Sequence, residues 1–118
     1  IAPSGNRGQD SPFSPASSFD ALGGAGLIVG SHDGAGNRSF FSNGAQGHET
    51  NFITAPGEKI LAAGNLSDDA YFRVTGTSMA APQVAAAAAL IWSHSTFSAF
   101  GHRNVFSQKK LCELALAY

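Results

Sequence analysis

The sequence predicts an α/β fold, with a mostly parallel central sheet and a buried central helix that begins at Ser78. Short apolar segments alternate with loops rich in Gly, Ser and Pro along most of the chain. A run of strong helix formers then occupies residues 80–93. Strands and loops that lead into one apolar helix are typical of layered α/β domains. The length of 118 residues, 43% of them hydrophobic, corresponds to at most one small domain with its own core.

Several segments have the composition of short strands. Residues 26–30 form an apolar run bounded by glycines, which is typical of a buried strand. Weaker strand patterns occur at residues 59–62 and 71–74, and residues 51–55 flank a loop that contains glycine. Residues 1–3 are interpreted as the end of a strand that starts before Ile1, which makes the chain a piece of a longer protein.

The helix predicted over residues 80–93 has almost no polar face. A helix that is apolar all round is expected to be buried on all sides. Pro82 is tolerated because it lies near the start of the helix, where backbone N–H groups have no partner within the helix. Residues 108–116 carry a weaker helical pattern.

Composition excludes several classes of function. Seven Lys and Arg against eight Asp and Glu give a net charge of −1, so the basic surplus that nucleic-acid binding requires is lacking. No apolar run approaches the roughly 20 residues that cross a bilayer. A single cysteine, Cys112, excludes an internal disulfide and a Cys-rich zinc site. No cofactor motif is found either, since the glycines at 24–26 precede their strand rather than follow it.

Ser78 lies between the predicted strand at 71–74 and the helix. Gly76 lets the chain turn sharply, and the start of a helix directs the positive end of its dipole at any negative charge that develops there. A serine in this place is suited to act as a nucleophile, provided that a base takes its proton. The alternative is that Ser78 only caps the helix, since Ser is a favoured N-cap residue.

Two motifs resemble the subtilisin-like serine proteases, or subtilases. Residues 76–82 (GTSMAAP), followed by an alanine-rich segment, resemble the nucleophile motif of that family. Residues 4–6 (SGN) resemble its Ala-Gly-Asn segment. The resemblance implies that Ser78 is the nucleophile, and that the Asn6 side chain and the Ser78 backbone N–H donate hydrogen bonds to the oxyanion. It also implies that Pro3, Ser4 and Gly5 line the pocket for the residue before the cleaved bond.

Weaker matches to the family lie between these two motifs, at residues 12–16, 39–44 and 54–57. The resemblance therefore runs in one order to about residue 93, and residues 94–118 form an uncertain tail of the same partial domain. Two smaller departures from the family are Gln83, where His is common, and Ala86, where Gly is common.

The catalytic base and its orienting carboxylate are the main departure. In subtilases, an Asp-[Ser/Thr]-Gly segment and a His-Gly-Thr segment precede the Asn donor, and this sequence has neither. His32 and Asp33 are not expected to replace them, because adjacent residues on an extended segment point in opposite directions. The resemblance thus implies the C-terminal part of a serine endopeptidase that acts on polypeptides and needs the missing N-terminal half of its domain. The alternative is a non-catalytic remnant or pseudoenzyme with a structural or peptide-binding role.

Further expectations follow from the resemblance. Most subtilases are exported, so it implies a secreted or cell-envelope protein. Family members often use structural calcium, for which Asp10, Asp68 and Asp69 are candidate ligands; solvated loop carboxylates are the alternative. Half of an α/β sheet would expose an edge and one side of its helix, so the isolated chain is expected to aggregate or to depend on a partner.

Overall fold

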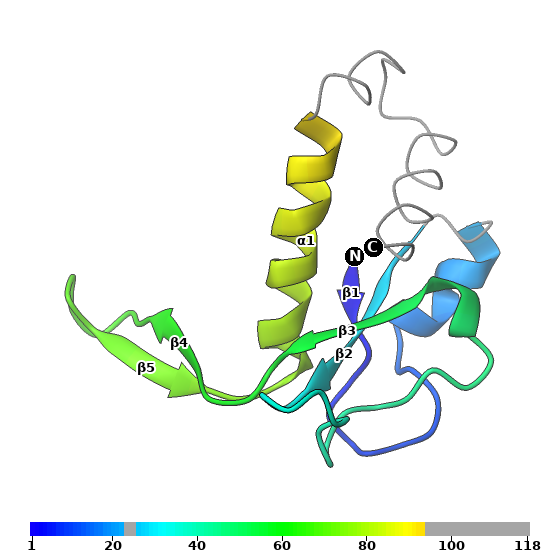
Figure 1. The fold of residues 1–118 in the computed structure, drawn as a ribbon, viewed down its shortest axis with the longest axis horizontal. Coiled ribbons are helices and arrows are strands. Elements are labelled where there is room, and N and C mark those ends of the chain that lie inside the picture. The colour runs from blue at the N-terminus through cyan, green and yellow to red at the C-terminus, as the bar shows by residue number, and fades with distance from the viewer. Residues whose placement is uncertain (23–25, 94–118) are drawn as a thin grey trace.

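The computed structural model describes residues 1–22 and 26–93 of the chain (Figure 1). The weak helical pattern at residues 108–116 lies outside the described residues. In chain order the elements are strand β1 (Ala2–Pro3), 3₁₀ helix η1 (Ala16–Leu22), strand β2 (Ile28–His32), 3₁₀ helix η2 (Glu49–Asn51), strands β3 (Phe52–Pro56), β4 (Ile60–Ala63) and β5 (Tyr71–Val74), and helix α1 (Thr77–Ser93).

Strands β1, β2 and β3 form a parallel sheet in that order. In the register, Ala2 pairs with Ile28, and Ile28 pairs with Phe52. Parallel pairing brings the carboxyl ends of all three strands to one edge. The predicted α/β fold with a parallel sheet and a central helix is confirmed, and the helix begins one residue earlier than expected, at Thr77.

Helix α1 packs on one face of this sheet through small side chains. Val29 of β2 and Leu27, which lies just before that strand, form a cluster with Ala80, Ala81 and Val84 of the helix. Alanine at these positions lets the helix approach the strands closely, because its side chain adds little thickness to the interface. Alternation along β2 points Ile28 to the opposite face, where it joins a second cluster with Ala2 and Ala16.

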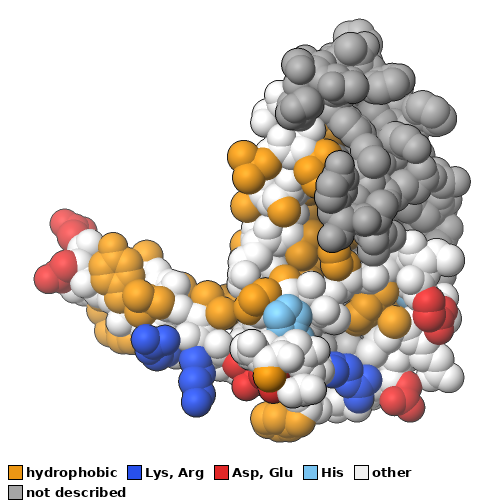
Figure 2. Space-filling model, in the orientation of Figure 1, with side chains coloured by type: hydrophobic (Ala, Val, Ile, Leu, Met, Phe, Trp, Pro, Cys, Tyr) orange, Lys and Arg blue, Asp and Glu red, His pale blue; other side chains and the backbone are white. Residues whose placement is uncertain are grey.

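The expectation that the helix is buried on all sides is wrong for the described structure. Ala80, Ala81, Val84 and Ala88 are buried, whereas residues 85–87 are exposed and Leu90 is 73% exposed. The physical reason is that the sheet covers only one side of the helix. Figure 2 shows hydrophobic side chains along the exposed flank, in agreement with the expectation that half a sheet leaves one side of its helix uncovered.

Strands β4 and β5 form a separate antiparallel hairpin, which extends from the body as an arm (Figure 1). Both strands were expected from the sequence, but they do not belong to the central sheet. Their apolar side chains are largely exposed, with Leu61 60% and Tyr71 64% accessible. The arm connects β3 to α1 along the chain. Among the described residues, no helix is long and apolar enough to cross a membrane.

Candidate active site

The segment that follows β1 and the first turn of α1 meet at the carboxyl edge of the parallel sheet. Ligand sites of open α/β sheets form at this edge, because loops from several strands converge there. The backbone N–H of Gly76 donates to the carbonyl of Gly57, at 2.8 Å. This bond fixes the turn into α1 against the end of β3.

Asn6 and Thr77 are in direct contact, although 71 positions separate them. The Asn6 Oδ1 atom accepts hydrogen bonds from the Thr77 backbone N–H and from the Thr77 hydroxyl, both at 2.9 Å. Only the oxygen of an amide can accept two such bonds, so they set which way round the amide lies. The Nδ2 group of Asn6 is therefore held away from Thr77.

The Asn6 Nδ2 atom and the Ser78 backbone nitrogen lie near the same point, next to Gly76. A methyl group built on Gly76 would lie 3.4 Å from Asn6 Nδ2 and 3.8 Å from Ser78 N. Neither group donates a hydrogen bond to any residue in the described part of the chain. The first N–H groups of a helix lack partners within it and favour negative charge, so the two nitrogen atoms lie near one point at which an anionic oxygen would be favoured.

The Ser78 side chain is exposed. A capping serine precedes the first turn of a helix and accepts a hydrogen bond from a backbone N–H of that turn. Ser78 is instead the second residue of α1, and its hydroxyl makes no hydrogen bond within residues 1–22 and 26–93. The interpretation of Ser78 as a simple helix cap therefore does not fit the structure.

The three residues expected to line a substrate pocket lie immediately before Asn6. Ser4 is fully buried, and its hydroxyl donates to the backbone carbonyl of Asn43 at 3.0 Å. Pro3 and Gly5 are half-buried. Gly5 has a φ of 112°, and a side chain there would meet Asn43 Nδ2 at 2.8 Å, so this position requires glycine. Contact with a substrate stays a prediction for all three.

His32 and Asp33 do not form an acid–base pair. The Nδ1 atom of His32 lies 2.6 Å from the backbone carbonyl oxygen of Asp33 rather than from its carboxylate. The Asp33 carboxylate accepts from Asn37 and Ala35 within its own turn. These bonds, that from the Asn37 side chain above all, lower the pKa of Asp33 below its usual value. The carboxylate is thus used to close a surface turn.

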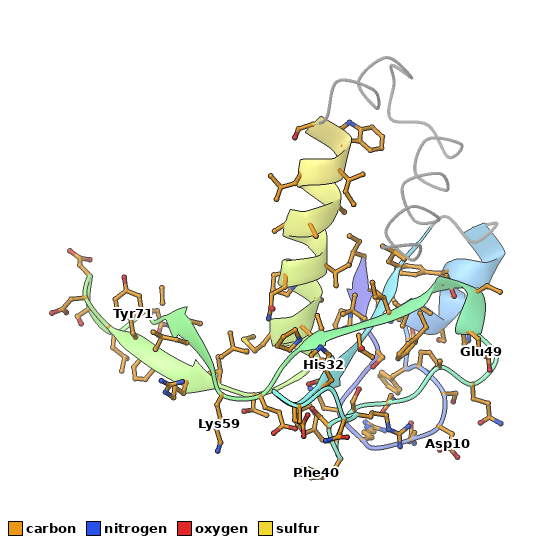
Figure 3. The ribbon with its side chains drawn as sticks, viewed as in Figure 1. Asp10, His32, Phe40, Glu49, Lys59 and Tyr71 are labelled. Carbon is orange, nitrogen blue, oxygen red and sulfur yellow. The ribbon has the colours of Figure 1, made fainter. Side chains whose placement is uncertain are left out.

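The carboxylates considered for calcium do not form a common site. Asp68 and Asp69 lie in the turn at the tip of the arm, whereas Asp10 lies on the side of the molecule away from the arm (Figure 3). Within the described ranges, no group of three or more His, Cys, Asp or Glu side chains is placed to hold a metal ion. Structural calcium therefore stays a prediction from the family resemblance.

Three residues contribute to this site in ways that the sequence did not indicate. Thr77 orients Asn6, and Asn43 contacts the segment around Asn6. Gln83 donates through Nε2 to the carbonyls of Pro56 and Met79, at 2.7 and 2.9 Å, and so ties the first turn of α1 to the end of β3. Thr77 and Asn43 both lie within motifs that resemble the family. This resemblance was the one sequence signal that could have pointed to them.

Comparison with known proteins identifies the family that this chain resembles. A family model described as "Subtilase family" matches residues 1–105. The Major intracellular serine protease of Bacillus subtilis (strain 168) is 37% identical over 94 residues, which is 80% of this chain and 28% of that protein.

Solved structures are similar as well. The Patellamide maturation protease PatA matches with a TM-score of 0.71 and 35% identity, over 94% of this chain and 37% of that one. A cold adapted subtilisin-like serine proteinase matches with a TM-score of 0.69 and 30% identity, over 95% of this chain and 36% of that one. The chain thus spans less than half the length of each of these relatives.

The Thr77 contacts predict how firmly the Asn6 amide is held. Thr77→Val removes the hydroxyl donor but keeps the backbone donor and the shape of the side chain. We expect the Asn6 side-chain amide to become more mobile on the picosecond to nanosecond timescale, measured as a lower order parameter by ¹⁵N relaxation. Thr54→Val, at an exposed position of β3, is the control. Unchanged Asn6 order in Thr77→Val would contradict the role given to this hydroxyl.

Proposed function

This chain belongs to the subtilase family, and we propose that it supplies the nucleophile and the oxyanion-binding groups of a serine endopeptidase. One observation carries the proposal: Asn6 Nδ2 and Ser78 N lie close to the same point, and the side chain of Ser78 is exposed. Family membership predicts peptide-bond hydrolysis, and this arrangement contains the groups that such chemistry uses at the carbonyl.

In the proposed mechanism, the Ser78 Oγ atom attacks the carbonyl carbon of a peptide bond. As the new C–O bond forms, the carbonyl oxygen takes up negative charge and accepts hydrogen bonds from Asn6 Nδ2 and Ser78 N. Both donors are neutral amides, so they stabilise the charge without protonating the oxygen. Because Thr77 already holds the amide of Asn6, little reorientation is needed when the charge appears.

A base must take the Ser78 proton and return it to the leaving amine, after which water hydrolyses the acyl-enzyme. We assign this role to a histidine, oriented by an aspartate, from the segment that precedes Asn6 in relatives of full length. His32 is engaged with the backbone of Asp33, and the sequence contains neither family motif for these residues. The exposed flank of α1 and the outer edge of β1 are the surfaces that we assign to that N-terminal half.

Polypeptide is the proposed substrate class. A secreted or cell-envelope location stays a prediction from family resemblance alone. The Bacillus subtilis relative is by its name an intracellular protease, so family membership does not decide the compartment.

Completion of the domain predicts a gain of activity. The 118-residue chain alone should not react with a fluorophosphonate probe, because no base activates Ser78. The chain joined to the segment that precedes the matched region in the Bacillus subtilis relative should be labelled at Ser78 and should hydrolyse a peptide p-nitroanilide. Labelling is detected by mass spectrometry and hydrolysis by absorbance.

Ser78→Ala is the control in the completed protein and should abolish both signals. A folded, completed protein that is neither labelled nor active would contradict the endopeptidase proposal and favour the non-catalytic alternative. Turnover by the 118-residue chain alone, lost in Ser78→Ala, would contradict the need for an external base.

The oxyanion role of Asn6 predicts a specific kinetic defect. Asn6→Leu in the completed protein should lower kcat by roughly 10²–10³ and leave KM nearly unchanged, because the lost hydrogen bond strengthens only in the transition state. That magnitude is the known cost of losing such a donor in subtilisin itself, and is not calculated from this structure. Asn65→Leu, in the exposed turn of the arm, should change neither constant. An equal loss in both variants would refute the assigned role.

A further inference from the structure

We propose that Asn43 is a positioning residue, which holds the chain on both sides of Asn6 so that the Asn6 amide meets the oxyanion. This inference rests on the function proposed above and extends it to a residue that acts through another. Asn43 is fully buried, so it acts on the protein and not on a substrate.

The side chain of Asn43 holds the segment after Asn6. Its Oδ1 atom accepts hydrogen bonds from the backbone N–H groups of Arg7, at 3.0 Å, and Gln9, at 3.2 Å. No strand partner is available to these N–H groups, because the segment lies beyond the end of β1. Asn43 therefore satisfies two loop donors that would otherwise need water or another acceptor.

The backbone of Asn43 holds the segment before Asn6. Its N–H donates to the Gly5 carbonyl at 2.9 Å, and its carbonyl accepts from the Ser4 hydroxyl at 3.0 Å. The residues immediately before and after Asn6, Gly5 and Arg7, are thus both bonded to one buried residue. The position of the Asn6 backbone is fixed from one side by Asn43, while Thr77 fixes its side chain from the other.

Asn43 is itself anchored to the sheet. The Ser42 hydroxyl donates to the Asn43 carbonyl at 3.1 Å and accepts from the backbone N–H of Ser31 in β2 at 2.9 Å. A continuous set of hydrogen bonds thus leads from the central sheet through Ser42 and Asn43 to the loop that carries Asn6. Polar groups buried in such a network are rigid when they are satisfied.

The packing of Asn43 against Gly5 shows which atom of the Asn43 side chain matters. The Nδ2 group of Asn43 lies where a side chain at Gly5 would be, and it has no hydrogen-bond partner among the described residues. A buried amide group without a partner lowers the stability of the fold. At the position of Nδ2 an apolar group of similar size would therefore be more favourable than the amide nitrogen. What asparagine provides here is its oxygen, and the role we assign to Asn43 is that of an acceptor.

The test uses the completed protein described above, with the peptide p-nitroanilide as substrate. Asn43→Leu removes the acceptor at similar volume, whereas Asn43→Asp keeps an oxygen in the same place. We expect Asn43→Leu to lower kcat by about 10- to 100-fold with KM within about twofold, since small misplacements of reacting groups cost rates of this order. Asn43→Asp should recover most of kcat. If Asn43→Leu does not fold, Asn43→Ser takes its place, because its short side chain cannot reach both amides.

Asn51→Leu is the matched control. Asn51 is 3% exposed and has no side-chain hydrogen bond in the described part of the chain, so its replacement alters a buried asparagine that is not hydrogen-bonded to the Asn6 loop through its side chain. It should leave kcat unchanged. An equal loss of kcat in Asn51→Leu and Asn43→Leu would overturn the proposal, as would full activity in Asn43→Leu.

A double-mutant cycle with Asn6→Leu separates positioning from general stability. If Asn43 acts through Asn6, Asn43→Leu should lower kcat less than about threefold once Asn6 is already leucine, because coupled residues are not additive. A loss in the Asn6→Leu background as large as in the parent protein would overturn the proposal.

Amide hydrogen exchange in the completed protein separates this inference from the proposed function, because it does not depend on activity. In Asn43→Leu the amides of Arg7 and Gln9 should exchange at least about tenfold faster than in Asn51→Leu. Equal exchange in the two variants would overturn the proposal, whether or not the completed protein is an enzyme. The amides of Arg7 and Gln9 could exchange faster in Asn43→Leu while the completed protein shows no activity. This result would support the contacts of Asn43 and refute the proposed function.

Discussion

The contact between Asn6 and Thr77 joins the two ends of the site, and the remaining geometry depends on it. Two hydrogen bonds of 2.9 Å connect a loop near the start of the chain to the first turn of the last described helix. They take the oxygen of the Asn6 amide and leave its nitrogen beside the backbone nitrogen of Ser78. Without them the two donors would be independent groups on separate segments. With them, both nitrogen atoms lie near one point before any substrate arrives, and the function that we propose requires such preorganised donors.

The fold makes this contact through short side chains. Alanines on the buried side of α1 allow it to lie close to the sheet, so that its first turn reaches the loop after β1. Around the loop, buried serines and Asn43 replace the large apolar residues of an ordinary core. Such groups hold backbone segments by directed hydrogen bonds, which fix position more narrowly than apolar packing does. The region near Ser78 is therefore held by a polar network, and the apolar clusters lie on the two faces of the sheet.

The sequence predicted the fold class, most strand positions and the helix, because apolar runs and alanine content are local signals. The nearness of Asn6 to Ser78 was available only through resemblance to a family, since no local pattern links residues so far apart. The pairing of β4 with β5 outside the sheet could not be predicted, because both segments have weak alternation and pairing depends on the path of the whole chain. The role proposed for Asn43 could not be predicted from the sequence either. Its side chain accepts hydrogen bonds from the backbone N–H groups of Arg7 and Gln9, and every residue type except proline has such a group.

The most direct test is a structure of the completed protein with a peptide boronic acid bound to Ser78. A tetrahedral adduct carries an oxygen in the place of the oxyanion. The account predicts that this oxygen lies at hydrogen-bond distance, about 2.7–3.1 Å, from both Asn6 Nδ2 and Ser78 N. An adduct on Ser78 whose oxygen contacts neither donor would contradict it.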